Sequence, residues 1–203
     1  MLIYIILNII AYIVKEEQKM KSTGIVRKLD ELGRVVIPKE IRRTLRIKEG
    51  DPLEIFTDKE GEVILKKYSP IGELSEFAAE YAETLTKTTG HIACITDKDT
   101  VIAVSGASKK EWLEQGISQE LEEILDNKVK YVSKENNDMA VPITQNEKND
   151  KIYKAQVIYP IISDGDAIGS VILLSKDDKT KMSEVEQKVA QSAANFLGKQ
   201  MEI

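Results

Sequence analysis

The sequence predicts an α+β protein with two domains, and three observations support this prediction. Residues 20–70 read as four short strands and one helix, whereas residues 71–203 read as helix, strands, helices, strands and helix. Pro70 and Gly72 mark a hinge between the two segments, at residues 68–72. A content of 42% apolar and 31% charged residues in a chain of 203 is typical of globular proteins and excludes the disordered and fibrous classes.

Residues 1–14 are almost wholly apolar. The run is shorter than the roughly 20 apolar residues of a membrane-spanning helix, and no Lys or Arg precedes it as in a secretion signal. Met20 begins a sequence that reads as a start of its own. We therefore interpret residues 1–19 as a mis-assigned start, with a peripheral membrane anchor as the alternative, and we expect no membrane association.

Within residues 20–70, alternating apolar residues and turn residues predict each element in order. Strands are expected at 23–29, 34–37, 52–56 and 63–68, and turns at 30–33, 48–51 and 58–61. Pro38 fits the first turn of a helix over residues 39–45, in which Ile41 and Leu45 share one face. About 50 residues lie near the lower limit for a domain that folds alone, so two chains are expected to complete one core.

The arginines are confined to this N-terminal domain. All five of them lie between residues 27 and 46: Arg27, Arg34, Arg42, Arg43 and Arg46. Residues 21–48 hold nine basic and three acidic residues, whereas residues 71–203 hold 15 lysines, no arginine and 23 acidic residues. The planar fork of Arg suits bidentate contact to phosphates and guanine edges. On a chain of net charge −5, this basic cluster indicates a nucleic-acid site, and a solvated charged face is the alternative.

Three stretches of this domain, STGIVRK (22–28), DELGRVVIP (30–38) and EIRRTL (40–45), resemble the AbrB-like swapped-hairpin DNA-binding domain. The resemblance implies that two chains interleave hairpins into a barrel-like dimer that presents Arg27, Arg34, Arg42 and Arg43 to double-stranded DNA. Arg46 is added on charge alone and is interpreted as a solvated cation at a helix end. The family also contains antitoxins, so an antitoxin that neutralises a partner toxin remains the alternative function.

Phosphate contacts position such a protein, and the shape and deformability of DNA can supply the remaining selectivity. If a dimer neutralises about eight phosphates, the logarithm of the binding constant falls with the logarithm of salt concentration at a slope of about −7. We expect this salt dependence of the intact protein.

Residues 71–203 predict a sheet covered by terminal helices. Helices are expected at 73–88, 109–113 and 119–125, strands at 91–96, 100–105, 128–133, 153–162 and 167–175, and a loop at 139–150. A last helix carries an apolar stripe that is either core or a seam with another chain: Met182, Val185, Val189, Ala193 and Phe196.

The stretches PII (160–162) and DGDAIGSVIL (164–173), followed by a closing helix, resemble a GAF domain, and the PAS fold is the nearest rival. An AbrB-like domain followed by a GAF-like domain resembles sporulation regulators that join these two parts. This resemblance implies a cytoplasmic transcription regulator, both activator and repressor of sporulation genes, that assembles as a homotetramer. It also allows a small-molecule effector of unknown identity at the GAF-like domain.

The chain has one Cys and one His, which excludes an internal disulfide framework and any site that needs two histidines of one chain. Cys94 and His91 lie three apart in one expected strand and so point to opposite faces, which disfavours joint metal binding. Trp112 is interpreted as core, Ser108 as a helix N-cap, and Asp164 and Asp166 as turn formers. No phosphate-binding loop or nucleophile–base spacing stands out, so we expect no catalysis, cofactor or metal.

Overall fold

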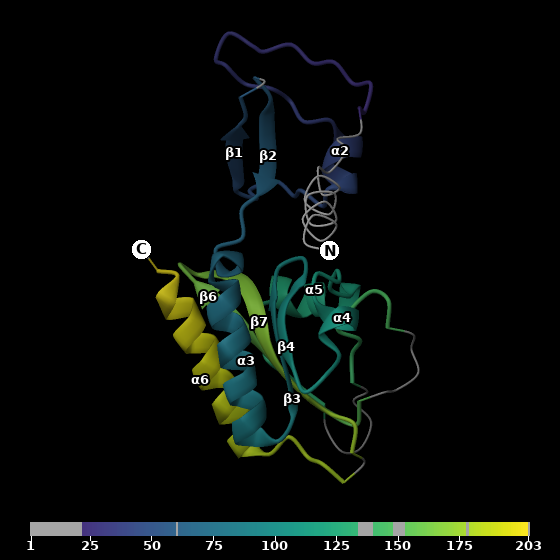
Figure 1. Ribbon diagram of the computed structural model, residues 1–203, viewed down its shortest axis with the longest axis vertical. Coiled ribbons are helices and arrows are strands. Elements are labelled where there is room, and N and C mark those ends of the chain that lie inside the picture. Colours follow the sequence, from purple (N-terminus) through teal and green to yellow (C-terminus); the bar gives the residue numbers. More distant parts are fainter. Residues whose placement is uncertain (1–21, 60, 134–139, 148–152, 178, 203) are drawn as a thin grey trace, which may run out of the picture. The chain divides into compact units, whose positions relative to one another are not determined.

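The computed structural model describes residues 22–59, 61–133, 140–147, 153–177 and 179–202 (Figure 1). The chain divides into two compact units, residues 1–48 and residues 49–203. The expectations for residues 1–19 and for part of the loop at 139–150 lie outside the described residues. Among the described residues, no helix has both the length and the apolar character needed to cross a bilayer.

The described residues of the first unit hold one short helix, α2 (Lys39–Thr44), which confirms the helix predicted after Pro38. The strands predicted at 23–29 and 34–37 are absent, and this prediction is wrong for the single chain. A strand needs a neighbour for its backbone hydrogen bonds, and no described strand of the chain pairs with either segment. Their apolar side chains stay uncovered: Val26, Leu29, Val35 and Val36 are all exposed.

The antiparallel hairpin predicted at the end of residues 20–70 is present and lies at the start of the second unit. Strands β1 (Leu53–Thr57) and β2 (Val63–Lys67) pair with Leu53 opposite Lys67 and Thr57 opposite Val63. Within this unit no residue of either strand is buried, and Ile55 and Val63 are 67% and 65% exposed. The hairpin therefore presents apolar side chains that are uncovered within this unit.

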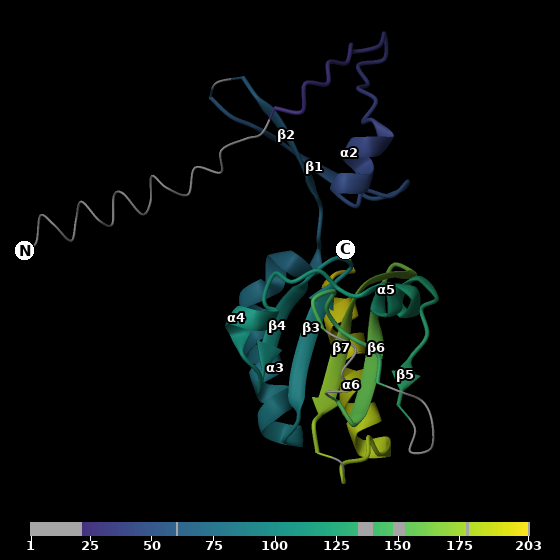
Figure 2. The same cartoon turned by 90° about the vertical axis from the view of Figure 1, so that its right-hand side faces the viewer.

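The rest of the second unit is a five-stranded antiparallel sheet in the order β4-β3-β7-β6-β5. Its strands are β3 (Ile92–Asp97), β4 (Val101–Ser105), β5 (Tyr131–Val132), β6 (Ala155–Ser163) and β7 (Asp166–Ser175). Its helices are η1 (Ile71–Leu74), α3 (Ser75–Thr89), α4 (Lys109–Trp112), α5 (Gln119–Asp126) and α6 (Glu184–Gln200). Helices α3 and α6 cover one face, and α4 and α5 lie on the other (Figures 1 and 2).

Both faces of this sheet are buried, so its central strands read as continuous apolar runs. In β7, Val171 and Leu173 join the core under α3 and α6, whereas Ile172 and Leu174 join the core on the opposite face. The alternation follows from the two-residue period of a strand. These strands and helices confirm the α+β architecture predicted for residues 71–203.

The strand predicted at 128–133 is shortened to β5 (Tyr131–Val132). Lys128 has a positive φ of 55°, and its ammonium group contacts the Gly165 carbonyl oxygen and the Asp166 carboxylate, at 2.5 and 3.0 Å. A left-handed residue interrupts the extended backbone of a strand. The strand therefore begins only after this turn.

Two glycines allow backbones to approach closely, one where α6 meets the sheet and one between two neighbouring strands of the sheet. A Cβ atom on Gly198 of α6 would lie 2.1 Å from the carbonyl oxygen of Ile162 in β6. A Cβ atom on Gly169 of β7 would lie 2.0 Å from the carbonyl oxygen of Thr96 in β3. Both contacts are shorter than any side chain permits, so each position requires glycine.

Candidate nucleic-acid interface

The turn at residues 30–34 is built around the carboxylate of Asp30. Its Oδ1 accepts the backbone N–H groups of Leu32 and Arg34 at 3.0 and 2.8 Å, and its Oδ2 accepts Nε of Arg34 at 2.9 Å. Gly33 supplies the positive φ of 75° that the turn requires. The side chain of Arg34 is 70% exposed and its Nε edge is held, so the edge formed by its terminal nitrogens is suited to a phosphate.

Asp30 stays ionised across the neutral range. The backbone N–H of Arg34 lowers the pKa of this carboxyl below its ordinary value of 3.8, slight burial opposes that shift, and the Arg34 side chain adds to it. Because its pKa is lowered, Asp30 stabilises the turn fully at pH values above the ordinary pKa of 3.8. This stabilisation is lost as the pH falls through the lowered pKa. The turn that carries Arg34 is therefore intact at neutral pH.

Helix α2 carries Arg42 and Arg43 in its last turn. A cation is favoured there because the carbonyl end of a helix is electronegative. Arg43 is exposed, whereas Arg42 is half-buried and its Nε is a buried donor with no hydrogen-bond acceptor among the described residues. A buried, unpaired donor costs free energy.

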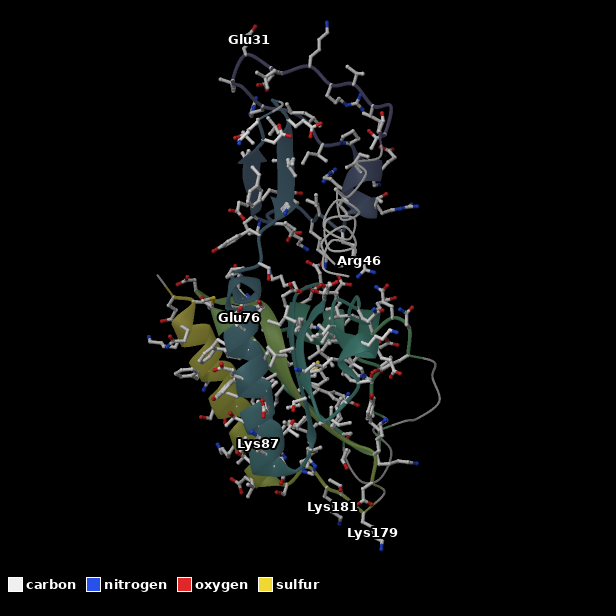
Figure 3. All side chains as sticks on the ribbon, viewed as in Figure 1. Glu31, Arg46, Glu76, Lys87, Lys179 and Lys181 are labelled. Carbon is white, nitrogen blue, oxygen red and sulfur yellow. The ribbon has the colours of Figure 1, made fainter. Side chains whose placement is uncertain are left out.

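Arg46 follows α2 in the left-handed conformation, with a φ of 52° (Figure 3). The N–H of Ile47 donates to the carbonyl oxygen of Arg42 at 2.8 Å, and the N–H of Arg46 donates to that of Arg43 at 3.3 Å. This pair of bonds is the Schellman termination, in which glycine is favoured at the position of Arg46.

Replacing Arg46 by glycine is expected to raise the free energy of unfolding by about 1 kcal/mol, because a left-handed L-residue costs roughly that much. The affinity for duplex DNA at 0.15 M salt is expected to change by less than about threefold, as for an exposed cation screened by salt. Denaturant unfolding and fluorescence anisotropy measure the two quantities. A tenfold loss of affinity would show that Arg46 contacts DNA.

Arg27 is exposed in a segment without regular secondary structure, and its guanidinium group donates to the carbonyl oxygen of Val26 at 3.1 Å. The four predicted DNA-binding residues thus come from three separate places: this segment, the turn of Asp30 and helix α2 (Arg27, Arg34, Arg42 and Arg43). Their convergence on one surface stays a prediction, because it depends on the strands at 23–29 and 34–37, which the single chain does not form.

In the second unit, His91 and Cys94 lie apart as predicted. Cys94 is completely buried in the core on the α4 and α5 side, and this burial raises the pKa of its thiol. His91 Nε2 lies 3.9 Å from a carboxylate oxygen of Glu186 in α6, on the other side of the sheet. Among the described residues, no three His, Cys, Asp or Glu side chains gather in a way that could hold a metal ion.

Three smaller predictions meet different outcomes. Trp112 is core, as predicted, at 7% exposure and with its ring edge towards Tyr153 at a centroid distance of 6.1 Å. Asp164 and Gly165 form the β6–β7 turn with positive φ values of 49° and 83°, which confirms the turn. Ser108 stands before α4, but its side chain makes no capping hydrogen bond, and Glu111 donates to its backbone oxygen instead.

Sequence reasoning missed one charged cluster. Lys67, at the end of β2, lies between the carboxylates of Asp51 and Asp99, at 3.1 and 2.7 Å. The hydroxyl of Ser69 donates to Asp97 at 2.9 Å. Contacts between residues 28 to 32 positions apart leave no local pattern that could have revealed them.

An arginine-rich unit with no buried residue among those described, joined to a helix-covered α+β sheet, is the arrangement expected of a regulator with a DNA-recognition domain and a second folded domain. Comparison with known proteins identifies the family. Residues 73–202 match the family described as Stage V sporulation protein T C-terminal, transcription factor. Residues 26–73 match the family described as Antidote-toxin recognition MazE, bacterial antitoxin.

The chain is 52% identical to stage V sporulation protein T of Bacillus subtilis (strain 168) over 183 residues, covering 90% of this chain and 99% of that protein. It is 72% identical over 51 residues to the transition state regulatory protein AbrB of the same strain, covering 25% of this chain and 52% of AbrB. The chain therefore belongs to the stage V sporulation protein T family, a family of transcription factors, and its N-terminal segment is an AbrB-type domain.

Two solved structures overlap the second unit. Residues 122 to 287 of a methyl-accepting chemotaxis protein are 15% identical, with a TM-score of 0.51, and the match covers 63% of this chain and 88% of that chain. The GAF domain of an Acinetobacter phosphoenolpyruvate-protein phosphotransferase is 12% identical, with a TM-score of 0.48, and covers 63% and 81%. At such identities only the fold is shown, and the first of these structures supports the α+β fold predicted for residues 71–203.

Proposed function

We propose that the chain regulates transcription of sporulation genes by binding double-stranded DNA as a swapped-hairpin dimer, with Arg27, Arg34, Arg42 and Arg43 as the contact residues. The protein acts in the cytoplasm and both activates and represses its targets. The GAF-like unit works through assembly and through a small-molecule effector, without catalysis or a bound cofactor. Membership of the family supports the regulatory role, and the separate confinement of all five arginines to residues 27–46 supports the site.

One observation carries the dimer. Of the described residues between 22 and 67, none is buried, although the segment contains large apolar side chains that include Val26, Leu32 and Val36 at 72% exposure or more. A segment that buries no side chain gains almost no hydrophobic stabilisation to offset its conformational entropy. A second copy supplies the missing core, and it also doubles the arginine array from five to ten.

The outer surface of α3 and α6 supports a tetramer built from two such dimers. Phe77, Tyr81 and Phe196 form an aromatic cluster with centroid distances of 5.7 to 6.0 Å, and Phe77 and Phe196 stay 38% and 43% exposed. Of the predicted apolar stripe, Met182, which precedes α6, and Ala193 are buried, whereas Val185 is 66% exposed. The stripe is thus partly core, and the remainder fits a seam with another chain.

Replacing Phe196 by aspartate is expected to halve the mass of the assembly from tetramer to dimer. A carboxylate placed in an apolar interface costs several kcal/mol in desolvation. Light scattering after size exclusion measures the mass. Asn195→Asp adds the same charge at the preceding position of α6, which is also exposed, and is expected to leave the mass unchanged. Equal masses for both variants would locate the tetramer interface elsewhere.

Titration of duplex DNA across a salt series tests the proposed function directly. The protein comprising residues 20–203 is expected to show a slope near −7 for about eight neutralised phosphates. A protein truncated after residue 70 is expected to bind as a dimer with lower affinity, because the tetramer links two DNA-binding dimers. A monomeric protein, or one without affinity for any duplex at low salt, would overturn the proposal.

The match of residues 26–73 to a family described as bacterial antitoxin keeps a second function open to test. The toxin-binding segment of an antitoxin is usually short and disordered, whereas residues 71–203 of this chain belong to a folded unit. This difference disfavours the antitoxin function. Copurification from the native host separates the two functions. Stoichiometric recovery of a small toxin with the protein would favour the antitoxin.

A further inference from the structure

A charged junction lies inside the second unit, where the β1–β2 hairpin meets the sheet. Nζ of Lys67, the last residue of β2, lies 3.1 Å from Oδ2 of Asp51 and 2.7 Å from Oδ2 of Asp99. Asp51 precedes β1, and Asp99 lies in the turn between β3 and β4. The side chains are 20%, 9% and 29% exposed, so the ammonium group bridges the two carboxylates with little access for water.

A second contact reinforces this junction. The Ser69 hydroxyl, two residues beyond β2, donates to Oδ2 of Asp97 at 2.9 Å. Oδ1 of Asp97 accepts the backbone N–H groups of Asp99 and Thr100 at 2.7 and 2.6 Å. The carboxylate of Asp97 thus holds the β3–β4 turn with one oxygen and the segment after the hairpin with the other.

Acidic side chains outnumber basic ones around this junction. A cavity of about 300 Å³ adjoins the junction, and its lining includes five aspartates and two lysines: Asp51, Asp97, Asp99, Asp164, Asp166, Lys67 and Lys98. Burial lowers the pKa of Lys67, but its hydrogen bonds to Asp99 and Asp51 outweigh burial and raise it. Lys67 is therefore charged at neutral pH, and its removal would leave Asp51 and Asp99 facing each other.

The two sides of the junction belong to parts with different tasks. β3, which leads to Asp97 and Asp99, is a central strand of the GAF-like sheet and contributes side chains to both of its cores. The β1–β2 hairpin belongs to the segment that matches the AbrB-type domain. We propose that the Lys67–Asp51–Asp99 junction couples the DNA-binding domain, through its β1–β2 hairpin, to the β3–β4 turn of the GAF-like sheet, which makes Lys67 a positioning residue.

This inference rests on the proposed function, because it assigns a route by which assembly or an effector alters DNA binding. Coupling is reciprocal, so DNA bound to the hairpin side has to stabilise the turn as much as the turn favours DNA binding. That reciprocity allows a test without knowledge of the effector, with duplex DNA as the only probe.

Amide hydrogen exchange of the full chain, with and without duplex DNA, tests the coupling. In the wild-type protein, DNA is expected to slow exchange at Asp99 and Thr100 at least about threefold. In Lys67→Met and Asp99→Asn this protection is expected to disappear, while Lys67→Arg retains it. Lys66→Met removes the same charge at the neighbouring exposed position of β2 and is expected to keep the protection.

The outcomes separate this inference from the proposed function, because DNA affinity is measured on the same samples. Bound DNA without protection of the turn in the wild-type protein, or with equal protection in Lys67→Met and Asp99→Asn, overturns the coupling alone. Absence of DNA binding in the wild-type protein overturns the proposed function and this inference with it. Exchange in β7 reports whether each variant retains its sheet.

Discussion

Replacing Arg34 by alanine is expected to reduce the affinity for duplex DNA by about 10²- to 10⁴-fold. A dimer loses two charge-assisted hydrogen-bonding groups, each worth about 1.5–3 kcal/mol. The side chain is 70% exposed, and its one described partner is Asp30 in the same turn, so the dimer is expected to stay folded. Arg42→Ala is expected to abolish binding similarly, because it removes another of the guanidinium groups predicted to contact DNA.

Fluorescence anisotropy across a salt series measures this loss of affinity, and the change in the salt slope shows whether phosphate contacts were lost. Removing two phosphate contacts per dimer should reduce the slope from about −7 to about −5. Arg34→Lys keeps the charge and loses the planar fork, so it should retain the slope and lose part of the affinity. Light scattering confirms that the variants remain assembled. Unchanged affinity of Arg34→Ala would refute the site.

Replacing Gly198 by alanine is expected to destabilise the second unit by about 1–3 kcal/mol, since the added methyl group forces a packed helix away from the sheet. The new Cβ would lie 2.1 Å from the backbone carbonyl oxygen of Ile162, and neither the helix backbone that carries the Cβ nor the strand backbone can move without disturbing its own hydrogen bonds. In an exposed helix the same replacement stabilises by about 1 kcal/mol. The sign of the change is therefore diagnostic.

Calorimetry measures this effect, at roughly 2–4 °C in Tm for each kcal/mol in a unit of this size. Ser192→Ala lies on the exposed side of α6 and is expected to leave Tm unchanged or slightly higher. A Tm for Gly198→Ala at or above that of Ser192→Ala would show that α6 does not pack against β6 as described.

Elements whose partners lie within the chain were predictable from sequence. The strand at 167–175 reads as an unbroken apolar run because both faces of β7 are covered, and Gly90 with its φ of 73° ends α3 where expected. The segments 23–29 and 34–37 carry equally clear strand patterns, yet they form no strand. Their pattern describes an assembly of two chains, and one chain cannot supply the ladder.

The candidate site divides in the same way. The confinement of arginine to residues 27–46 is a property of composition, visible without coordinates. The details that give each arginine its character are not: the Asp30 contact to Arg34, the buried Nε of Arg42 and the left-handed backbone of Arg46 depend on geometry. The Lys67 junction joins residues 32 positions apart, and periodicity carries no information at that separation.

The bare apolar side chains of residues 22–67 have a quantitative consequence for the cell. Because an intact DNA-binding head exists only when two copies meet, its abundance rises with the square of copy number as long as most copies remain single. Halving expression would then cut the number of working heads about fourfold. The number of functional DNA-binding heads therefore responds more steeply to gene dosage than it would for a protein whose DNA-binding domain folds alone.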